Sequence, residues 1–300
     1  MCRKRGQSLR LNIAVIDNGV NRELLEILLP NKKAAADCRQ ILDGVCVPQF
    51  LEPEGDLESH GTLCTALLMD FLEKNHTADY RVFSVSILNR NRGQEIGEFC
   101  AALEWCVVQK MDVVLMSIGV KIPVYAKRFL PLLDRAKEQG TVLLAAASNA
   151  FEITYPACYE DVIGIKKSGC YGIKAIREPK GGIDLEGNFE ASCVMDRYSK
   201  WIGEPYGVSN SFALPYIAAS ICSLLQRNGK MGKRDLVGCF SETKDKNLPP
   251  VLYMKEAIPK IAVIYRECAG KNLKSALEDI VLRFEEKGYS CICAADWENC

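Results

Sequence analysis

Short apolar runs rich in valine and isoleucine alternate along the chain with longer stretches whose apolar residues recur at helical spacing. Such alternation is typical of parallel strands covered by helices on both faces. The short runs predict strands at residues 12–16, 81–87, 112–117, 141–147 and 162–165. The longer stretches predict helices at residues 61–72, 96–110 and 125–139. Gly140 is placed to cap the last of these helices. The pattern therefore predicts an α/β fold built from repeated β-α-β units.

The pattern changes after residue 166. Two glycine-rich, strand-like pieces follow at residues 172–177 and 183–189. A long apolar helix is predicted from Ser211 to about Gln226, ended by Gly229.

A polar stretch at residues 241–250, with a Pro-Pro pair, is typical of a linker. Beyond it, a strand at 261–265, a helix at 273–287 and a strand at 289–294 predict a small βαβ-like unit. We therefore expect two parts: a domain at 1–245 and a C-terminal extension at 251–300. The pattern leaves open whether the extension docks a substrate or partner, or stabilises the domain.

The charge of the chain argues against two classes of partner. Its 300 residues carry 38 Lys plus Arg and 38 Asp plus Glu, a formal net charge of 0. A chain without net charge is not attracted to nucleic acid or to anionic lipid by its overall charge.

The apolar stretches of the chain are short. The first of them, residues 11–16, is shorter than the roughly 7–15 apolar residues of a signal peptide, and no run approaches the ~18 apolar residues of a membrane span. We expect a soluble protein with no nucleic-acid or membrane partner; the oligomeric state is left open.

Fifteen cysteines are an odd and high number. An odd count leaves at least one thiol unpaired, which favours a reducing compartment and hence a cytoplasmic protein. Metal-type spacing is absent, since Cys291 and Cys293 flank one residue and His60 and His76 are the only histidines. No metal site is predicted. Six cysteines in apolar surroundings are expected to act as small buried hydrophobes: Cys64, Cys106, Cys158, Cys193, Cys222 and Cys239.

Polar side chains follow the predicted strands or open the predicted helices. Asp17 and Asn149 each come directly after an apolar strand, while His60 and Ser211 precede helical stretches. The carboxyl ends of parallel strands share one edge of a sheet, where functional groups collect. A serine hydroxyl becomes a nucleophile when an imidazole takes its proton, and a carboxylate orients the imidazole. Asp17, His60 and Ser211 supply these groups, although each alone could equally cap a turn or a helix.

An acyl-transfer site also needs donors for the oxyanion that develops on the substrate. An asparagine amide and a backbone N–H at a helix N-terminus supply such donors. Asn149 and the amide of Ser211 fit these roles. A nucleotide-binding protein is a weaker alternative, because residues 18–21 contain neither a G-x-G-x-x-G motif nor a Walker lysine.

Six segments, collinear over about residues 11–228, resemble the subtilisin-like serine proteases, or subtilases. They are similar in turn to the family's Asp box, His box, substrate-binding strand, oxyanion-Asn segment, the stretch after that Asn, and Ser box. The segments are 13–20 (Ile-Ala-Val-Ile-Asp-Asn-Gly-Val), 59–62 (Ser-His-Gly-Thr), 114–119 (Val-Leu-Met-Ser-Ile-Gly), 145–149 (Ala-Ala-Ala-Ser-Asn), 155–159 (Tyr-Pro-Ala-Cys-Tyr, with Val162-Ile163) and 209–219 (Ser-Asn-Ser-Phe-Ala-Leu-Pro-Tyr-Ile-Ala-Ala).

The resemblance implies a three-layer, subtilisin-like fold with a mainly parallel central sheet. It implies a triad of Asp17, His60 and Ser211 with Asn149 in the oxyanion hole, acting on a peptide or protein substrate. It also implies that the substrate binds along a fixed set of residues: Ser117, Ile118, Gly119, Ala147 and Ser148. No cofactor is expected. Family members often bind calcium, yet the sequence has no compact run of acidic and asparagine ligands like an EF-hand loop.

The chain departs from the family at several positions. Ser209 and Asn210 stand where Gly-Thr usually precedes the nucleophile, Tyr216 replaces a histidine, and Ser148 replaces a glycine. Residues 166–206 also lack a clear Ala-Pro-Gly element. Counting back from Pro215 selects Ser211 rather than Ser209 as the nucleophile. These changes leave open a catalytically weak or inactive subtilisin fold that binds peptides or partners.

The position of Asp17 adds an expectation about the role of the enzyme. Secreted subtilases usually carry a signal peptide and a prodomain, and the chain has room for neither before Asp17. We therefore expect a dedicated intracellular processing protease, for example one that removes a leader from a precursor peptide.

Overall fold

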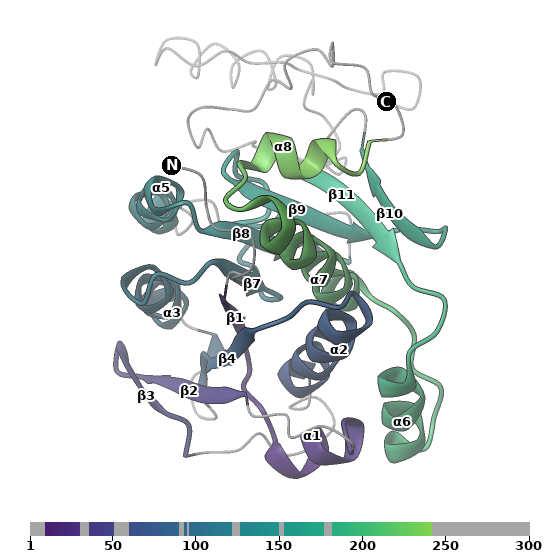
Figure 1. The fold of residues 1–300 in the computed structure, drawn as a ribbon. Helices are drawn as coiled ribbons and strands as arrows, with labels where there is room; N and C mark the ends of the chain where they lie inside the picture. Colours follow the sequence, from purple (N-terminus) through teal and green to yellow (C-terminus); the bar gives the residue numbers. More distant parts are fainter. Residues whose placement is uncertain are drawn as a thin grey trace, which may run out of the picture. The chain divides into compact units, whose positions relative to one another are not determined.

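The computed structural model describes residues 10–30, 36–50, 60–89, 93–94, 96–121, 127–149, 153–176 and 182–241 (Figure 1). Nearly all of the predicted linker and the whole predicted extension at 251–300 lie outside the described residues. The predicted domain boundary and the βαβ-like unit therefore stay predictions.

A nine-stranded sheet forms the centre of the described domain. Its strands are β1 (Leu11–Asp17), β2 (Asp37–Leu42), β3 (Val45–Pro48), β4 (Tyr80–Ser86), β7 (Val113–Met116), β8 (Val142–Ala146), β9 (Val162–Lys167), β10 (Gly172–Ala175) and β11 (Ile183–Asn188). Their order is β10-β11-β9-β8-β7-β1-β4-β2-β3. Neighbours from β11 to β2 are parallel, and the edge pairs β10-β11 and β2-β3 are antiparallel. β5 (Leu88–Asn89) and β6 (Gly93–Gln94) form a separate two-stranded ribbon.

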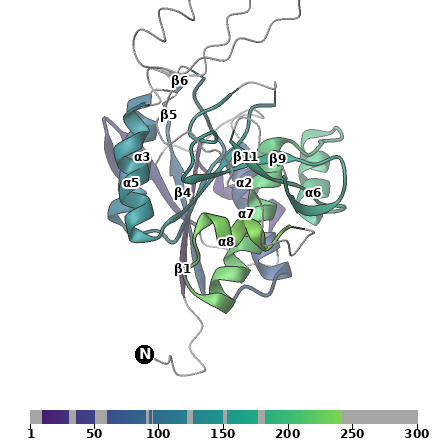
Figure 2. The same ribbon diagram turned by 90° about the horizontal axis from the view of Figure 1, so that it is seen from above.

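Helices cover both faces of this sheet, which gives the predicted three layers (Figures 1 and 2). The helices are α1 (Arg22–Leu28), α2 (His60–Lys74), α3 (Ile96–Val108), α5 (Leu130–Gln139), α6 (Cys193–Ile202), α7 (Asn210–Asn228) and α8 (Lys233–Gly238). Side chains of α3 and α5 form one apolar cluster with alternate residues of the central strands. Side chains of α1, α2, α6 and α7 form a second cluster on the opposite face. The expectation of an α/β fold with a mainly parallel sheet is confirmed.

The central strands are buried on both faces, which explains their continuous apolar sequence. In β1 every residue from Ile13 to Ile16 has an exposed fraction of 0%. Full burial of one such valine or isoleucine side chain contributes about 1.5–3 kcal/mol to folding. The short apolar runs therefore mark strands, and the predicted strand ends differ from the observed ends by only one or two residues.

The ends of α5 and α7 follow the predicted glycine signals, and the starts of both helices correct the predicted boundaries. Gly140 ends α5 in the left-handed region at φ 75°, and Gly229 is the C-cap of α7. Residues 127–129 form a 3-10 turn before α5, rather than the first turn of an α-helix. Helix α7 begins at Asn210 with Ser209 as its N-cap, so Ser211 lies within the first turn.

The expectation that six cysteines are buried is only partly correct. Cys64, Cys106 and Cys222 are buried in the apolar clusters. Cys158 is half-buried, and Cys193 and Cys239 are exposed. Cys193 is exposed because it is the first residue of α6, whose buried side includes the next two residues.

The chain connections after β1 and β7, which are neighbouring strands of the sheet, run in opposite directions. From β1 the chain continues to β2 on one side of the sheet, whereas from β7 it continues to β8 on the other side. Adjacent parallel strands whose connections diverge leave a crevice beyond their carboxyl ends, where ligands of open α/β sheets bind. Asp17 ends β1 and Ser117 follows the end of β7, so both lie at the carboxyl ends of these two paired strands.

Candidate active site

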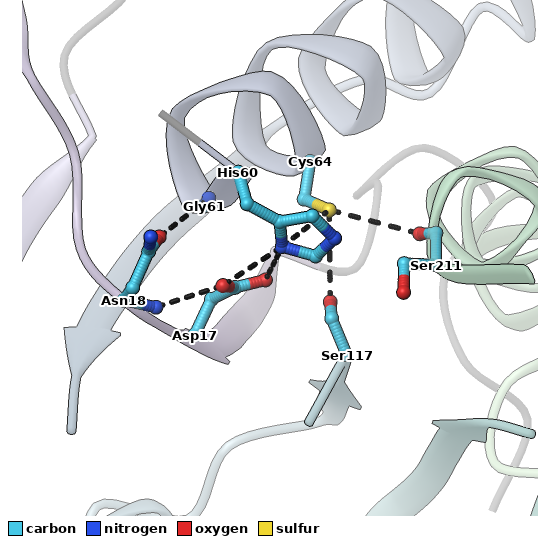
Figure 3. Close-up of polar contacts among 7 residues, drawn as sticks. All are labelled: Asp17, Asn18, His60, Gly61, Cys64, Ser117 and Ser211. Carbon is cyan, nitrogen blue, oxygen red and sulfur yellow. Dashed lines mark hydrogen bonds and ion pairs between the residues drawn. The ribbon is translucent and has the colours of Figure 1, made fainter. Parts of the chain in front are cut away.

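Asp17 and His60 form a close pair at the carboxyl end of β1 (Figure 3). The Nδ1 atom of His60 lies 2.9 Å from Oδ2 of Asp17 and 3.0 Å from Oδ1. The backbone N–H of Asn18 donates to Oδ1 of Asp17 at 2.8 Å. The side chain of Asp17 is 2% exposed and that of His60 is 29% exposed. A buried carboxylate thus holds an imidazole that remains accessible on its other side.

A tight packing contact fixes the start of α2, where His60 is the first residue. The backbone N–H of Gly61 donates to Oδ1 of Asn18 at 2.7 Å. A Cβ atom on Gly61 would lie 2.5 Å from the carbonyl oxygen of Gly19. Only glycine allows this approach, because real Cβ contacts are not that short. The glycine after His60 therefore sets the distance between helix α2 and the Asp17 turn.

The second ring nitrogen of His60 is on the side of the ring facing Ser211 (Figure 3). Nδ1 donates to Asp17 in the neutral tautomer, so Nε2 carries the free lone pair. Ser211 is 9% exposed. Among the described residues its hydroxyl makes no hydrogen bond with the imidazole. Catalytic hydrogen bonds are often long before substrate binds, so this arrangement is compatible with a nucleophile and base pair.

Cys64 contacts three elements of the site. Its Sγ atom lies 3.9 Å from Nδ1 of His60, accepts a hydrogen bond from the Ser117 hydroxyl at 3.7 Å, and donates to the carbonyl oxygen of Ser211 at 3.6 Å. That carbonyl is free for Cys64 because Pro215, four residues later in α7, has no N–H to donate to it. The sequence pattern predicts Cys64 only as a buried hydrophobe. Its spacing of four residues from His60, which places both on one helix face, could have indicated this contact.

The charges of the pair shift the pKa values of both groups. Burial disfavours the ionised form of Asp17, but the charge of His60 and the hydrogen bonds from His60 and Asn18 lower its pKa below 3.8. The charges of Cys64, when its thiol is ionised, and of Asp17 stabilise the protonated imidazole, so the pKa of His60 is raised above 6.5 despite its burial. Burial raises the pKa of the Cys64 thiol. Asp17 is therefore ionised at neutral pH, and Cys64 is a neutral thiol.

Asn149 lies beyond the end of β8 and is held in place by a hydrogen bond from α7, the helix that carries Ser211. Its Oδ1 atom accepts a hydrogen bond from the backbone N–H of Asn210 at 3.2 Å. Asn149 is exposed, and within the described ranges its Nδ2 atom has no hydrogen-bond partner. The N–H groups of the first helical turn have no intrahelical acceptors, and the amide of Ser211 is one of them. The two candidate donors for an oxyanion, Nδ2 of Asn149 and the amide of Ser211, thus lie on segments that are joined by the hydrogen bond between Asn210 and Asn149.

The five residues predicted to bind substrate fall into two groups. Ser117, Ile118 and Gly119 follow β7 and are half-buried, and the hydroxyl of Ser117 points toward Cys64 rather than toward solvent (Figure 3). Ala147 and Ser148 follow β8, and their carbonyl oxygens accept hydrogen bonds from the side chain of Asn210. Direct contacts therefore join Ser117 to the Asp17–His60 region, and Ala147 and Ser148 to the start of α7.

The described residues contain one cluster that could hold a metal ion, formed by Asp17, His60 and Cys64, whose ligand atoms lie within 4.8 Å of one another. Calcium prefers six to eight oxygen ligands, so a carboxylate, an imidazole and a thiol do not fit it. This donor set suits a softer ion such as zinc. The three side chains also form the Asp–His pair itself, so a metal there would compete with that pair.

None of the helices in the described ranges combines the length and apolar character that crossing a membrane requires.

Comparison with known proteins gives a consistent family. The model of the Subtilase family (Peptidase_S8) matches residues 10–252. The minor extracellular protease Epr of Bacillus subtilis (strain 168) is 22% identical over 227 residues, which are 73% of this chain and 32% of Epr. Subtilisin NAT of Bacillus subtilis subsp. natto is 24% identical over 230 residues, which are 73% of this chain and 56% of that protein. The chain thus spans about a third to just over half of the length of these curated relatives.

One solved structure to which the chain is similar is that of a lanthipeptide protease. It is 14% identical in sequence, with a TM-score of 0.49. The matched region covers 76% of this chain and 78% of that one.

Proposed function

Because this chain belongs to the subtilase family, whose model matches most of its length, we propose that it is a serine endopeptidase with the triad Ser211, His60 and Asp17. The observation that carries the proposal is the geometry of the pair: a buried carboxylate binds Nδ1 of an imidazole whose other nitrogen faces the serine (Figure 3). This is the arrangement in which a neutral imidazole accepts the proton of a hydroxyl.

The reaction begins with acylation of Ser211. Its Oγ attacks the carbonyl carbon of the scissile peptide bond while Nε2 of His60 takes the hydroxyl proton. The imidazolium then gives this proton to the leaving amine as the C–N bond breaks, which leaves an acyl-enzyme. Water attacks the ester, with His60 again as base, and the acid product leaves as Ser211 regains its proton. Asp17 holds the tautomer of His60 and stabilises its charge throughout.

The oxyanion formed in each step is bound by Nδ2 of Asn149 and by the amide of Ser211. Nδ2 of Asn149 is available because Oδ1 is already bound to the backbone N–H of Asn210. Donors fixed before the reaction lower the barrier without a cost of reorganisation.

We propose that the substrate lies in an extended conformation along residues 117–119, paired main chain to main chain. The half-buried segment 117–119 lies at the end of β7, beside the Asp17–His60 pair. The Val120–Tyr155 bridge, with hydrogen bonds of 2.8 Å in both directions, supports the far end of this segment. A segment that is supported at both ends in this way can offer its main-chain groups to an added peptide strand.

Hydrolysis of a mixture of fluorogenic peptides tests the proposal. Ser211→Ala should abolish hydrolysis, whereas Ser209→Ala, two residues earlier, should retain it because Ser209 only caps helix α7. Equal activity in Ser211→Ala and the unaltered chain would overturn the assignment.

A second candidate is a subtilisin fold that binds peptides without cleaving them. The missing hydrogen bond between Ser211 and His60 and the altered residues before Ser211 favour it. Such a protein would bind peptides from the same mixture with equal affinity before and after Ser211→Ala, and would release no product.

The finer role that we propose is cytoplasmic maturation of a precursor peptide by leader removal, without a cofactor. The cysteine-rich composition supports a reducing compartment, where a narrow substrate range protects other proteins. A small precursor gene beside the gene for this chain, and cleavage of that precursor in the presence of EDTA, would support it. Loss of activity in EDTA that calcium restores would contradict the absence of a cofactor.

A further inference from the structure

Asn210, the residue before the proposed nucleophile, makes a set of contacts that the family's usual threonine cannot make. Its Nδ2 donates to the carbonyl oxygen of Ala147 at 3.2 Å and to that of Ser148 at 2.9 Å. Its Oδ1 accepts from the backbone N–H of Lys167 at 2.7 Å. Its own backbone N–H donates to Oδ1 of Asn149 at 3.2 Å. One residue thus joins three segments that are distant in the sequence.

The carboxamide group is what makes this junction possible. An amide offers two N–H donors and a carbonyl acceptor, whereas a threonine hydroxyl offers one donor on a shorter arm. The two carbonyl groups after β8 therefore share one NH₂ group, while the end of β9 binds the other side of the same amide. Half-buried Asn210 thus binds main-chain groups of the turn after β8 and of the end of β9.

We propose that Asn210 is a positioning residue for the oxyanion site, which rests on the proposed endopeptidase function. By fixing residues 147–149 against the start of α7, it sets the distance between Nδ2 of Asn149 and the amide of Ser211. Both donors must point at one oxygen atom for full stabilisation of the transition state. Within the described ranges, the side chain of Asn210 binds main-chain groups of Ala147, Ser148 and Lys167 rather than the hydroxyl of Ser211 or the imidazole of His60.

The first test is a double-mutant cycle with Asn149→Ala. Asn210→Ala should lower kcat by about 10–100-fold, since small misplacements of catalytic groups cost up to about 10²-fold. KM should change less. In the Asn149→Ala background the same substitution should lower kcat by less than about threefold, because the donor it positions is already gone. Equal losses in both backgrounds would overturn the proposal, because they would indicate a general structural effect.

The second test uses pH to restore the lost donor. In Asn210→Asp a carboxylate would face the carbonyl oxygens of Ala147 and Ser148, and repulsion would displace the turn. Protonation returns an O–H donor. The ratio of kcat/KM between Asn210→Asp and the unaltered chain should therefore rise as the pH falls toward about 5, where a carboxyl of raised pKa protonates. The same ratio for Asn210→Ala should be independent of pH. A flat ratio for both variants would contradict the inference.

Two further measurements separate failure of this inference from failure of the proposed function. Asn228→Ala, at the other end of helix α7, is the matched control and should leave kcat unchanged. If Ser211→Ala abolishes hydrolysis but Asn210→Ala behaves like Asn228→Ala, only the positioning role is wrong. If the unaltered chain hydrolyses no peptide, amide hydrogen exchange of residues 147–149 still tests the positioning role. Asn210→Ala should speed this exchange, and unchanged exchange would show that Asn210 does not hold these residues in place.

Discussion

At the scale of single residues, the charge beside His60 tunes the proposed base. An ionised Cys64 and the Asp17 carboxylate both stabilise the protonated form of His60, so its pKa lies above 6.5. Burial keeps Cys64 a neutral thiol at neutral pH, which leaves Asp17 as the charge that acts there. Only neutral imidazole accepts the serine proton, so kcat/KM should rise with pH through this raised pKa.

Cys64→Val should leave this rise in place, because the buried Cys64 thiol is neutral in this pH range and carries no charge that stabilises the imidazolium. Valine is an apolar side chain of similar size. The pH dependence of kcat/KM between about pH 5 and 10 detects any shift, and a thermal melt of the variant serves as the folding control. A shift of the rise to lower pH in a folded variant would mean that Cys64 is ionised beside His60.

Asn149→Ala should lower kcat by about 10²–10³-fold with little change in KM. This magnitude is known from the oxyanion asparagine of a subtilisin and is not obtained from this structure. The reason is that the Nδ2 donor acts mainly on the oxyanion of the transition state. Steady-state kinetics on one fluorogenic peptide gives both constants. A rise in KM at constant kcat would assign Asn149 to ground-state binding instead.

Chemistry and position coincide for Asp17 and His60. The sequence predicts them as partners because each stands at the edge of an element, and the Nδ1 and Oδ2 atoms of the two side chains lie 2.9 Å apart. Asn210 was noted only as a departure from the family. Its role depends on three main-chain groups brought together by tertiary packing, which a linear pattern does not reveal.

At the scale of elements, the start of α2 depends on close packing against the turn after β1. Gly61→Ala would place a Cβ atom 2.5 Å from the carbonyl oxygen of Gly19 and 2.7 Å from Oδ1 of Asn18. The helix must shift away, which displaces His60 from Asp17.

We therefore expect Gly61→Ala to lose most of its kcat/KM. Its free energy of unfolding, measured by urea denaturation, should fall by about 1–3 kcal/mol, as at other overpacked sites. Gly238→Ala is a control, since a Cβ atom there meets nothing within 4 Å. Full activity in Gly61→Ala would show that the position of α2 does not determine the geometry of the Asp17–His60 pair.

The elements that the sequence predicts well are the long or fully buried ones. The central strands and α7 have continuous apolar or helical patterns and were found within a few residues. Helices α1 and α6 and the β2-β3 hairpin were missed, because they are short and largely half-exposed, so their periodicity is weak. Their positions are determined by packing at the edges of the sheet.

At the scale of the whole molecule, helix α8 is fastened to the sheet by a buried ion pair. Nζ of Lys233 lies 2.9 Å from Oδ2 of Asp184 and donates to the carbonyl oxygen of Val162 at 2.7 Å. Oδ2 of Asp184 also accepts from the backbone N–H of Gly164 at 2.8 Å. The side chain of Asp184 is 0% exposed, so its charge depends on these partners.

Lys233→Met should lower the free energy of unfolding by about 3–5 kcal/mol, because it leaves a buried carboxylate without its counter-charge. Lys137→Met, which breaks the largely exposed pair with Asp161, should cost less than about 1 kcal/mol. Urea denaturation compares the two variants. Equal losses would indicate that the Asp184 site is hydrated and that α8 is not fastened by its charge.

The central claim for the molecule is that Ser211 is a nucleophile activated by His60 and Asp17. The most direct measurement is mass spectrometry of the chain after reaction with a fluorophosphonate, followed by peptide mapping. We predict one adduct on Ser211, retained in Ser209→Ala and absent from Ser211→Ala and from His60→Ala. No adduct on the folded, unaltered chain, or an adduct on Ser209, would contradict the claim.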